Sequence, residues 1–367
     1  MRSRFMPHCK FQVNNLSTFQ PLVSKARPAY SLCVKRVHPA PTKIRSLSMP
    51  ADTIKGFHHL TAMAADAAAN INFYTHVLGL RMVKVTVNFD DPGTYHLYYG
   101  DQLGSPGTVI TFFPWGGNAP AGEKGRGEIS AFTLRVPQGT KMAWEARLTA
   151  ARIPFVNIAR TEGEVLEFYD DSGHKLRIWA HGEPLPAERV VTDSPVPAAE
   201  QITEFAGVEF TVGNAAGTQA LLEGTMGLTS LGNGRYGFAT DTVQHIDVLE
   251  KPELPRMRFG SASVHHLAFQ VADDAEEIAW QAKLMDSGQS VTEVKDRQYF
   301  HSIYLREPGG IILELATIEP GFAVDEPLAE LGTNLKLPPQ YEEHRAELAR
   351  HLQPLPMVNY GVDLAAE

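Results

Sequence analysis

The sequence predicts an α+β fold in which one βαβββ unit is written four times, and two observations support this prediction. A strand-like opening, a helical segment and three further strand-like runs follow one another in the first part of the body, and this order then recurs three times. The four openings lie near residues 59, 131, 206 and 266, so the repeat spans roughly 60 to 75 residues. A unit of this size cannot bury its own sheet, so the units must pair.

The first unit shows the pattern most clearly. It opens with the β-like segment IKGFHHLTAMAAD. The next segment, AAANINFYTHVLGL, predicts a helix with Ile71, Tyr74 and Val77 on one face and Gly79 as its stop. The runs RMVKVTVNF, TYHLYYGD and GTVITFFPW follow as strands, because β-branched and aromatic residues alternate or cluster in them.

The other three units repeat this order with different residues. Their openings are ISAFTLRVP, ITEFAGVEFTV and ASVHHLAFQVADD, and their closing strands are DDSGHKLRIWA, VQHIDVLEKP and REPGGIILELAT. We expect two domains of two units each, at residues 51–185 and 200–320. A C-terminal arm, residues 321–367, contains a Pro-initiated helix that we expect to pack on the body or on a second copy in a homo-oligomer.

Residues 1–50 differ from the rest in composition. Nine Lys or Arg and no Asp or Glu occur before Asp52, and hydroxyl residues and prolines are scattered among them. This composition is typical of an organelle transit peptide, which would place the protein in a mitochondrion or plastid. A disordered tail, or initiation at Met49, is the alternative, and the protein would then be cytoplasmic.

The body is acidic and free of cysteine. After the extension, 24 basic residues face 42 acidic ones, which disfavours nucleic acid and anionic membranes as partners. No run of about 20 apolar residues exists that could span a bilayer. Cys9 and Cys33 both lie in the extension, so the body has no disulfide and no thiolate nucleophile.

Two histidine pairs stand on equivalent opening strands. GFHHLTAMAAD in unit one and SVHHLAFQVADD in unit four both place His-His-Leu shortly before an aspartate and a helix, with the pairs at 58–59 and 265–266. Units two and three have no histidine at these positions. Units one and four therefore share the predicted site, and units two and three form a degenerate pair in which Asp247 is a solvated or salt-bridged remnant.

Glu314 lies in the closing strand of unit four, in the aliphatic run GGIILELAT. A buried carboxylate without a partner costs several kcal/mol, so a cation or a basic side chain must face it. A salt bridge to Arg297 or Arg306, or an outward-facing edge position, is the alternative to metal ligation. Two histidines and one carboxylate form the set that non-haem Fe(II) oxygenases use, and they leave coordination positions open for substrate and O₂.

The chain resembles the vicinal-oxygen-chelate superfamily, and within it the hydroquinone-type ring-cleaving extradiol dioxygenases. The matching stretches include GFHHLTAMAAD, VHHLAFQV, DRQYFHSIYLREPGGIILELAT and LGTNLKLPPQYEEHR. The resemblance implies two paired, cupped mixed β-sheet barrels with helices outside. It also implies that the second histidine of each pair binds the metal, so that the ligands are His59, His266 and Glu314.

The resemblance further implies roles near the metal for five residues, which are Thr61, His58, His265, Arg297 and Tyr304. Ordinary strand-end hydrogen bonds or a surface charge would be the structural alternatives for them. Three other histidines are candidates for the pocket, namely His96, His245 and His301.

The expected activity is O₂-dependent ring opening of a hydroquinone or catechol on Fe(II), with Mn(II) as the alternative metal. His265 or Tyr304 would take the substrate proton, and Arg297 would stabilise the developing negative charge. A glyoxalase-type isomerase or lyase is the rival function. A binding protein without a metal is a weaker rival, because all three ligand residues are present.

Overall fold

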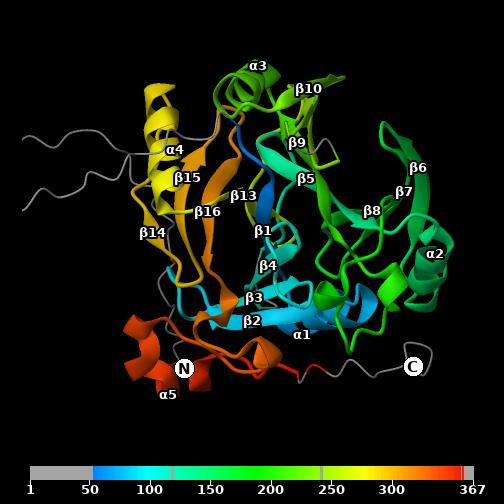
Figure 1. Ribbon diagram of the computed structural model, residues 1–367, viewed down its shortest axis with the longest axis vertical. Helices are drawn as coiled ribbons and strands as arrows, with labels where there is room; N and C mark the ends of the chain where they lie inside the picture. Colours follow the sequence, from blue (N-terminus) through cyan, green and yellow to red (C-terminus); the bar gives the residue numbers. More distant parts are fainter. Residues whose placement is uncertain (1–52, 117–119, 240–242, 357, 359–367) are drawn as a thin grey trace, which may run out of the picture. The chain divides into compact units, whose positions relative to one another are not determined.

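The computed structural model describes residues 53–116, 120–239, 243–356 and 358 (Figure 1). The predicted targeting segment or disordered tail, residues 1–50, lies outside these ranges. Among the described residues, no helix is long and apolar enough to cross a lipid bilayer.

Each of the four modules has the predicted order of elements. Module one consists of β1 (Phe57–Ala64), α1 (Ala67–Asn72) with the π-helical turn η1 (Phe73–Val77), β2 (Arg81–Val87), β3 (Tyr95–Gly100) and β4 (Val109–Pro114). Module two consists of β5 (Glu128–Val136), α2 (Lys141–Ala150), β6 (Phe155–Arg160), β7 (Gly163–Tyr169) and β8 (Lys175–Ala180).

The second half of the chain repeats the same order. Module three consists of β9 (Glu204–Val212), α3 (Ala215–Gln219) with η4 (Ala220–Thr225), β10 (Thr229–Gly232), β11 (Arg235–Gly237) and β12 (His245–Glu250). Module four consists of β13 (Val264–Val271), α4 (Asp274–Asp286), β14 (Lys295–Asp296), β15 (Phe300–Arg306) and β16 (Ile312–Pro320). Short 3₁₀ helices η2 (Ala187–Arg189) and η3 (Ala198–Glu200) connect the halves. The C-terminal arm contains η5 (Phe322–Val324), η6 (Leu328–Glu330), η7 (Pro339–His344) and α5 (Arg345–His351).

Local sequence signals set the ends of the first helix. The Asp66 side chain accepts a hydrogen bond from the Ala69 amide at 2.8 Å and caps the N-terminus of α1. Gly79 has a φ of 72°, which glycine adopts without steric cost, and the helical segment ends before it as predicted.

The modules pair to form two mixed eight-stranded sheets. The first sheet has the order β14-β15-β16-β13-β1-β4-β3-β2 and contains modules four and one, and the second has the order β10-β11-β12-β9-β5-β8-β7-β6 and contains modules three and two. The predicted α+β fold of paired βαβββ modules is therefore confirmed. The domain boundary between residues 185 and 200 stays a prediction, because each sheet takes four strands from either side of it.

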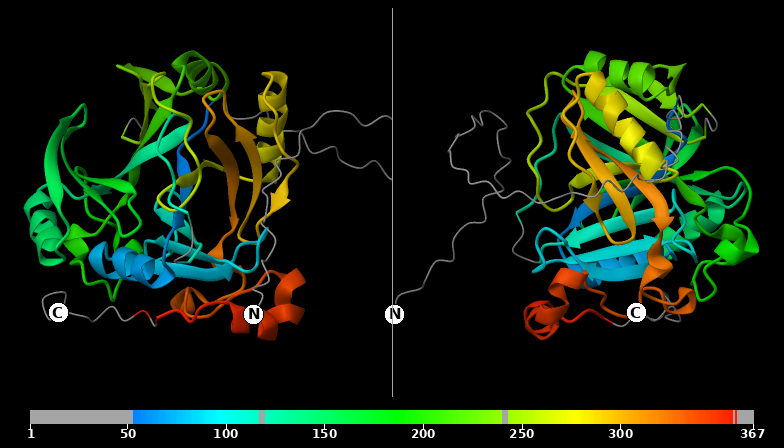
Figure 2. Two further views of the ribbon diagram at one scale, coloured as in Figure 1. Left: turned by 180° about the vertical axis from the view of Figure 1, so that it is seen from behind. Right: turned by 60° about the vertical axis from the view of Figure 1, so that its left-hand side comes forward.

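The first sheet curls strongly, so that β2 and β3 run across the direction of β15 and β16 (Figure 1). Helices lie on the outer side of the strands in all three views (Figures 1 and 2). Leu313 and Leu315 of β16 belong to the same buried core as Trp280 and Leu284 of α4. Because successive side chains of a strand point to opposite faces, Glu314 faces the inner side of this curled sheet.

The C-terminal arm covers the exposed edge of the first sheet. Leu335 forms a parallel bridge with Val85 of the edge strand β2, and the amide of Lys336 donates to the Val85 carbonyl at 2.9 Å. The fully buried Lys84 ammonium lies 2.7 Å from an Asp325 oxygen and 2.8 Å from a Glu326 oxygen. The backbone pairing of the arm with Val85 satisfies backbone groups that an open edge would leave exposed.

Glu277, in the first turn of α4, is a buried carboxyl group. Its exposed fraction is 0%, and neither side-chain oxygen has a hydrogen-bond partner among the described residues. Burial raises the pKa of Glu277 from 4.5 to about 7. The folded state therefore holds this proton more tightly than the unfolded chain does.

We predict that this proton makes the protein less stable as the pH rises through the interval from about 4.5 to 7. Glu277→Gln keeps the shape of the side chain and removes the titration. The free energy of unfolding of the wild type should fall by about 3 kcal/mol relative to the variant between pH 4.5 and about pH 8. Urea denaturation of both proteins across this range measures the difference, and parallel pH curves would contradict the prediction.

Candidate metal centre

The three predicted ligands converge on the inner side of the first sheet. His59 stands on β1, His266 on β13 and Glu314 on β16, which are neighbouring strands. The Nε2 atoms of the two histidines are 3.2 Å apart, and Glu314 Oε2 lies 3.3 Å from His59 Nε2 and 2.9 Å from His266 Nε2. All three side chains are buried, and together they could hold one metal ion.

The donor set fits a divalent cation. Glu314 is fully buried, and its Oε2 accepts no well-formed hydrogen bond from any described residue, whereas Oε1 accepts from the Ser302 hydroxyl. Burial alone would raise the pKa of Glu314, but the facing His59 and His266 imidazoles outweigh it and hold that pKa well below its usual value. A carboxylate oxygen without a hydrogen-bond donor lies beside two ring nitrogens here. A bound cation would accept electron pairs from all three atoms.

Two β-bulges explain why adjacent histidines reach the same place. In the antiparallel pairing of β1 with β13, Phe57 lies opposite Phe269 but His59 opposite Ala268, so His58 is an extra residue on β1. The pairing shifts again after Thr61, which faces His266, and this makes His265 an extra residue on β13. Strict alternation would send neighbouring side chains to opposite faces, and each bulge relaxes that rule.

The bulges bring the two rings of each pair into hydrogen-bonding contact. His58 Nδ1 lies 2.9 Å from His59 Nδ1, and His265 Nδ1 lies 2.7 Å from His266 Nδ1. Burial lowers the pKa of His58 and of His265 to about 3, so both are neutral near pH 7. A neutral ring can accept a hydrogen bond at Nδ1 from the Nδ1–H of its neighbour, which leaves the neighbour's Nε2 lone pair directed at the centre.

The second sheet has the same bulges but lacks the histidines. In the pairing of β5 with β9, the extra residues are Ser130 and Ala206, and the positions that match the two ligand histidines are Ala131 and Gly207. Asp247 of β12 occupies the position that corresponds to Glu314. Modules two and three thus lack both histidines at the positions that correspond to the ligands, as the sequence predicted.

Asp247 is salt-bridged, which is one of the two states expected for it. Arg235 donates to its two oxygens at 2.6 and 2.7 Å, and Arg160 donates at 2.9 Å. Glu162, His245 and Asp247 lie close enough to hold an ion, but these guanidinium groups already neutralise the carboxylates and would repel a divalent cation. His245 therefore belongs to the second sheet and not to the candidate metal centre.

Of the other predicted residues, Thr61 begins a hydrogen-bonded chain on the inner side of the first sheet. The Thr111 hydroxyl donates to Thr61 at 2.8 Å, His96 Nε2 lies 2.8 Å from Thr111 Oγ1, and the Tyr98 hydroxyl lies 2.8 Å from His96 Nδ1. Burial, and next the His59 and His266 rings, lower the pKa of His96 well below its usual value. His96 thus lies close to the candidate ligands.

Tyr304 and Arg297 form a second group beside the ligands. The Tyr304 ring lies 5.8 Å from the ring of His266, and Tyr304 faces Glu314 in the strand pairing. Arg297 Nε donates to the Tyr304 hydroxyl at 3.1 Å, and its guanidinium lies 5.3 Å from the centre of that ring. His301, in contrast, pairs with Asp274 of α4 at 2.7 Å and points away from the site.

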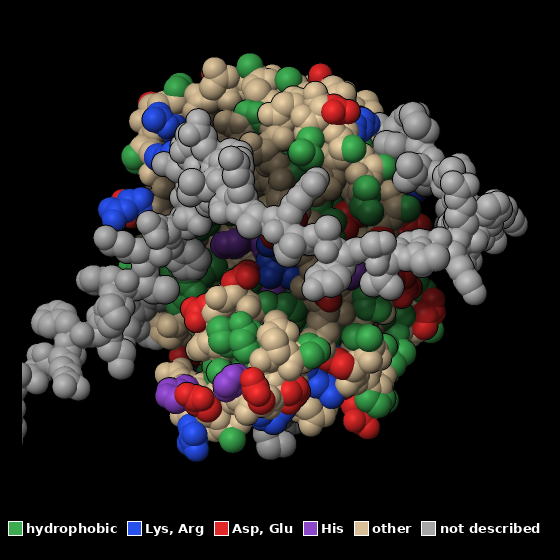
Figure 3. All heavy atoms as spheres, turned by 90° about the vertical axis from the view of Figure 1, so that its left-hand side faces the viewer, with side chains coloured by type: hydrophobic (Ala, Val, Ile, Leu, Met, Phe, Trp, Pro, Cys, Tyr) green, Lys and Arg blue, Asp and Glu red, His purple; other side chains and the backbone are tan. Residues whose placement is uncertain are grey.

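Sequence reasoning missed Ser302, Phe300 and Thr111. Ser302 and Phe300 precede Tyr304 on β15 by two and four residues, so the period of a strand could have placed them on the same face. The Phe300 ring lies 5.1 Å from the rings of His58 and His59 and packs against both. On the face shown in Figure 3, histidine side chains lie in a hollow with charged side chains around it.

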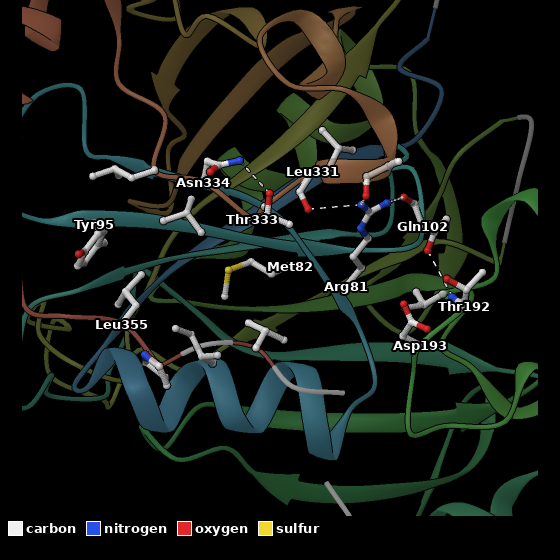
Figure 4. A pocket seen from close by; sticks show the side chains of 18 residues that line it. Arg81, Met82, Tyr95, Gln102, Thr192, Asp193, Leu331, Thr333, Asn334 and Leu355 are labelled. Atoms are coloured by element: carbon white, nitrogen blue, oxygen red, sulfur yellow. Dashed lines mark hydrogen bonds between the residues drawn. The ribbon is translucent and has the colours of Figure 1, made fainter. Parts of the chain in front are cut away.

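A cavity of about 640 Å³ lies elsewhere, between β2, α1 and the C-terminal arm (Figure 4). None of the three candidate ligands lines it. Arg81, its most prominent charged residue, donates to the carbonyls of Gln102, Leu328 and Ala329 and so holds the arm in place. Arg81 in this cavity therefore serves the fold.

Comparisons with known proteins identify the family of this chain. Residues 56–178 match the model of the Glyoxalase/Bleomycin resistance protein/Dioxygenase superfamily. The chain is 41% identical over 303 residues to the "Putative ring-cleaving dioxygenase MhqO" of Bacillus subtilis (strain 168), a match that covers 82% of this chain and 96% of that protein. It is 31% identical over 313 residues to the "Chlorohydroquinone/hydroquinone 1,2-dioxygenase" of Sphingobium indicum, covering 82% of this chain and 96% of that one.

A solved structure extends the likeness to the fold. The crystal structure of a "putative dioxygenase" from Bacillus subtilis subsp. subtilis str. 168 superimposes with a TM-score of 0.79 at 40% identity, and the match covers 83% of this chain and 99% of that chain. The paired βαβββ modules, the family match and these relatives lead to one conclusion. The chain belongs to the glyoxalase/bleomycin resistance protein/dioxygenase superfamily, the vicinal-oxygen-chelate group that its sequence resembles.

Proposed function

We propose that this protein is an Fe(II)-dependent, extradiol-type dioxygenase that opens the ring of a hydroquinone or catechol. The observation that carries the proposal is the convergence of His59, His266 and Glu314 at one buried point. Two imidazoles and one carboxylate occupy part of the coordination sphere of a divalent ion and leave the rest for substrate and O₂. The names of the relatives support the choice of reaction.

A bound Fe(II), or Mn(II) as the alternative, would lower the pKa of a substrate hydroxyl and let both reactants meet at one ion. The protein's own contribution begins with His58 and His265. Each lies within hydrogen-bonding distance of the Nδ1 atom of the ligand histidine that follows it, and by accepting that hydrogen bond it would fix the tautomer that offers Nε2 to the metal. We therefore assign positioning roles to both residues.

Tyr304 is better suited to donate a hydrogen bond than to remove a proton. Burial, and next the negative charge of Glu314, raise its pKa above the usual value, so the phenol keeps its proton. Arg297 already donates to the phenolic oxygen, which leaves the Tyr304 proton for a substrate oxygen. Arg297 adds the positive charge that stabilises an anionic substrate or product.

Thr61 is proposed to contact the substrate from the opposite side. Because its oxygen accepts from Thr111, its own proton is left to be donated, and the chain through His96 to Tyr98 holds the hydroxyl in place. The glyoxalase-type alternative normally uses a further carboxylate or amide ligand. The group of described residues around this point contains one carboxylate.

Oxygen uptake tests the proposal directly. The protein is loaded with Fe(II) or Mn(II) without oxygen, and O₂ consumption is then followed with hydroquinone and with catechol. We expect uptake with at least one of these rings and a ring-opened acid as product. No uptake with either would remove the dioxygenase proposal, whereas isomerisation of a glutathione adduct without uptake would favour the glyoxalase-type activity.

We predict that Glu314→Ala lowers bound metal from about one ion per chain to less than about a tenth, because the only charged ligand is lost. Metal content is measured by elemental analysis after gel filtration. Asp247→Asn is the matched control, since Asp247 holds the corresponding position in the second sheet. A control that loses metal to the same extent, or a Glu314 variant that retains it, would refute the assignment.

Replacing His265 with Phe should weaken metal binding by about 10- to 100-fold, because the ring remains but the acceptor at Nδ1 is gone. The dissociation constant is measured by competition with a chelator. His265→Gln, which offers an amide oxygen, should recover part of the loss. Equal affinity in the Phe variant and the wild type would show that the contact does not orient His266.

A further inference from the structure

We propose that Asp90 and Arg297 form a clasp at the outer side of the candidate metal centre, an inference that rests on the proposed function. The clasp holds the Arg297 guanidinium against Tyr304 between turnovers. It then releases the guanidinium to the anionic oxygen of an aromatic substrate or product. Asp90 is thereby assigned as a positioning residue of the active site.

The contacts of Arg297 connect the buried ligands with solvent. On one side its Nε donates to the Tyr304 hydroxyl at 3.1 Å, and Tyr304 faces Glu314 across the strand pairing. On the other side its Nη1 donates to Asp90 Oδ2 at 3.2 Å. The Arg297 side chain is 20% exposed and that of Asp90 is 75% exposed. The guanidinium is thus anchored at an inner, buried oxygen and at an outer, solvated one.

The second sheet contains a corresponding pair in a closed form. Because the strand orders match, the β2–β3 hairpin corresponds to β6–β7, and β14–β15 corresponds to β10–β11. Asp90 lies between β2 and β3, and Glu162 lies between β6 and β7. Arg235, at the start of β11, donates to Glu162 at 2.6 Å. In both sheets, an arginine of one hairpin therefore holds a carboxylate of the opposite hairpin.

The two pairs differ in burial, and burial decides whether they can open. Glu162 is 2% exposed and Arg235 is 8% exposed, so breaking their contact would leave unpaired charge inside the protein. An exposed pair shifts an equilibrium by a factor of only about two to five, because water and salt replace the lost partner. The Asp90 clasp can therefore open during turnover, whereas the Glu162 clasp is permanent.

An anionic ligand is the partner that this chemistry selects. The Arg297 guanidinium, which donates to Asp90, can instead donate to a phenolate or carboxylate oxygen of a ligand held beside Tyr304. Asp90 competes with that oxygen for the same donors, and its negative charge also repels the ligand. Removing the charge of Asp90 should therefore strengthen the binding of anionic aromatic ligands and leave neutral ones unaffected.

Benzoate and phenol are suitable probes, because they differ in charge near pH 7 and neither carries two hydroxyl groups. Binding is measured by calorimetry on the full chain, without oxygen, with and without added Fe(II). Asp90→Asn should bind benzoate about two to five times more tightly than the wild type and phenol equally well. Asp91→Asn is the matched control. It removes the same charge from the same exposed loop, and Asp91 has no ion pair with a described residue.

Two further variants complete the test. Arg297→Gln should weaken benzoate binding, and in the Arg297→Gln background Asp90→Asn should have no effect. Glu162→Gln should lower Tm by several degrees, whereas Asp90→Asn should leave Tm within about a degree. Equal benzoate affinity in the Asp90 and Asp91 variants would overturn the proposal. So would the absence of benzoate binding in every variant.

The binding readout is independent of turnover. If the Asp90 variant binds benzoate more tightly but no ring is opened, the proposed reaction is wrong and the clasp stands. If oxygen uptake is found but the affinities of the Asp90 and Asp91 variants agree, the reaction stands and the clasp is wrong.

Discussion

The antiparallel pairing of β1 with β13 is the constraint on which the rest of the site depends. It joins segments 207 residues apart and places the Nε2 atoms of His59 and His266 3.2 Å from each other. The two bulges within this pairing then turn His58 and His265 toward their neighbours. A regular ladder would send one histidine of each pair to the opposite face of the sheet. The hydrogen bond between the two imidazole rings could then not form.

The two sheets neutralise a buried carboxylate in two different ways. Each has a carboxylate at the same position of a closing strand, Glu314 in the first sheet and Asp247 in the second. Arg235 and Arg160 neutralise Asp247 permanently. Glu314 instead faces two imidazoles, and one of its oxygens has no hydrogen-bond donor in the part of the chain that the structure describes. A buried charge must be neutralised in both cases, and in the first sheet that requirement supports the proposed metal site.

The C-terminal arm connects the stability of the fold with the site. Phe322 and Leu331 of the arm share a buried cluster with Tyr98 and Phe300, which belong to the inner side of the first sheet. Phe300 in turn packs against the paired rings of His58 and His59. The arm therefore completes the wall behind the candidate ligands as well as covering the edge strand. The buried Lys84 that anchors it to β2 thus supports the geometry of the site from a distance.

Short stretches of sequence predicted the four modules, the histidine pairs on equivalent strands and a cation or basic side chain beside Glu314. These conclusions follow from local periodicity and from the cost of burying a charge, which are properties of short segments. The folded structure shows which histidines lie near the candidate ligands: His96 is linked to Thr61 through Thr111, and His301 pairs with Asp274 of α4. It also revealed the bulges and the contact between Asp90 and Arg297. Register shifts and contacts between hairpins depend on hydrogen bonds across distant strands, and no pattern within a single strand encodes them.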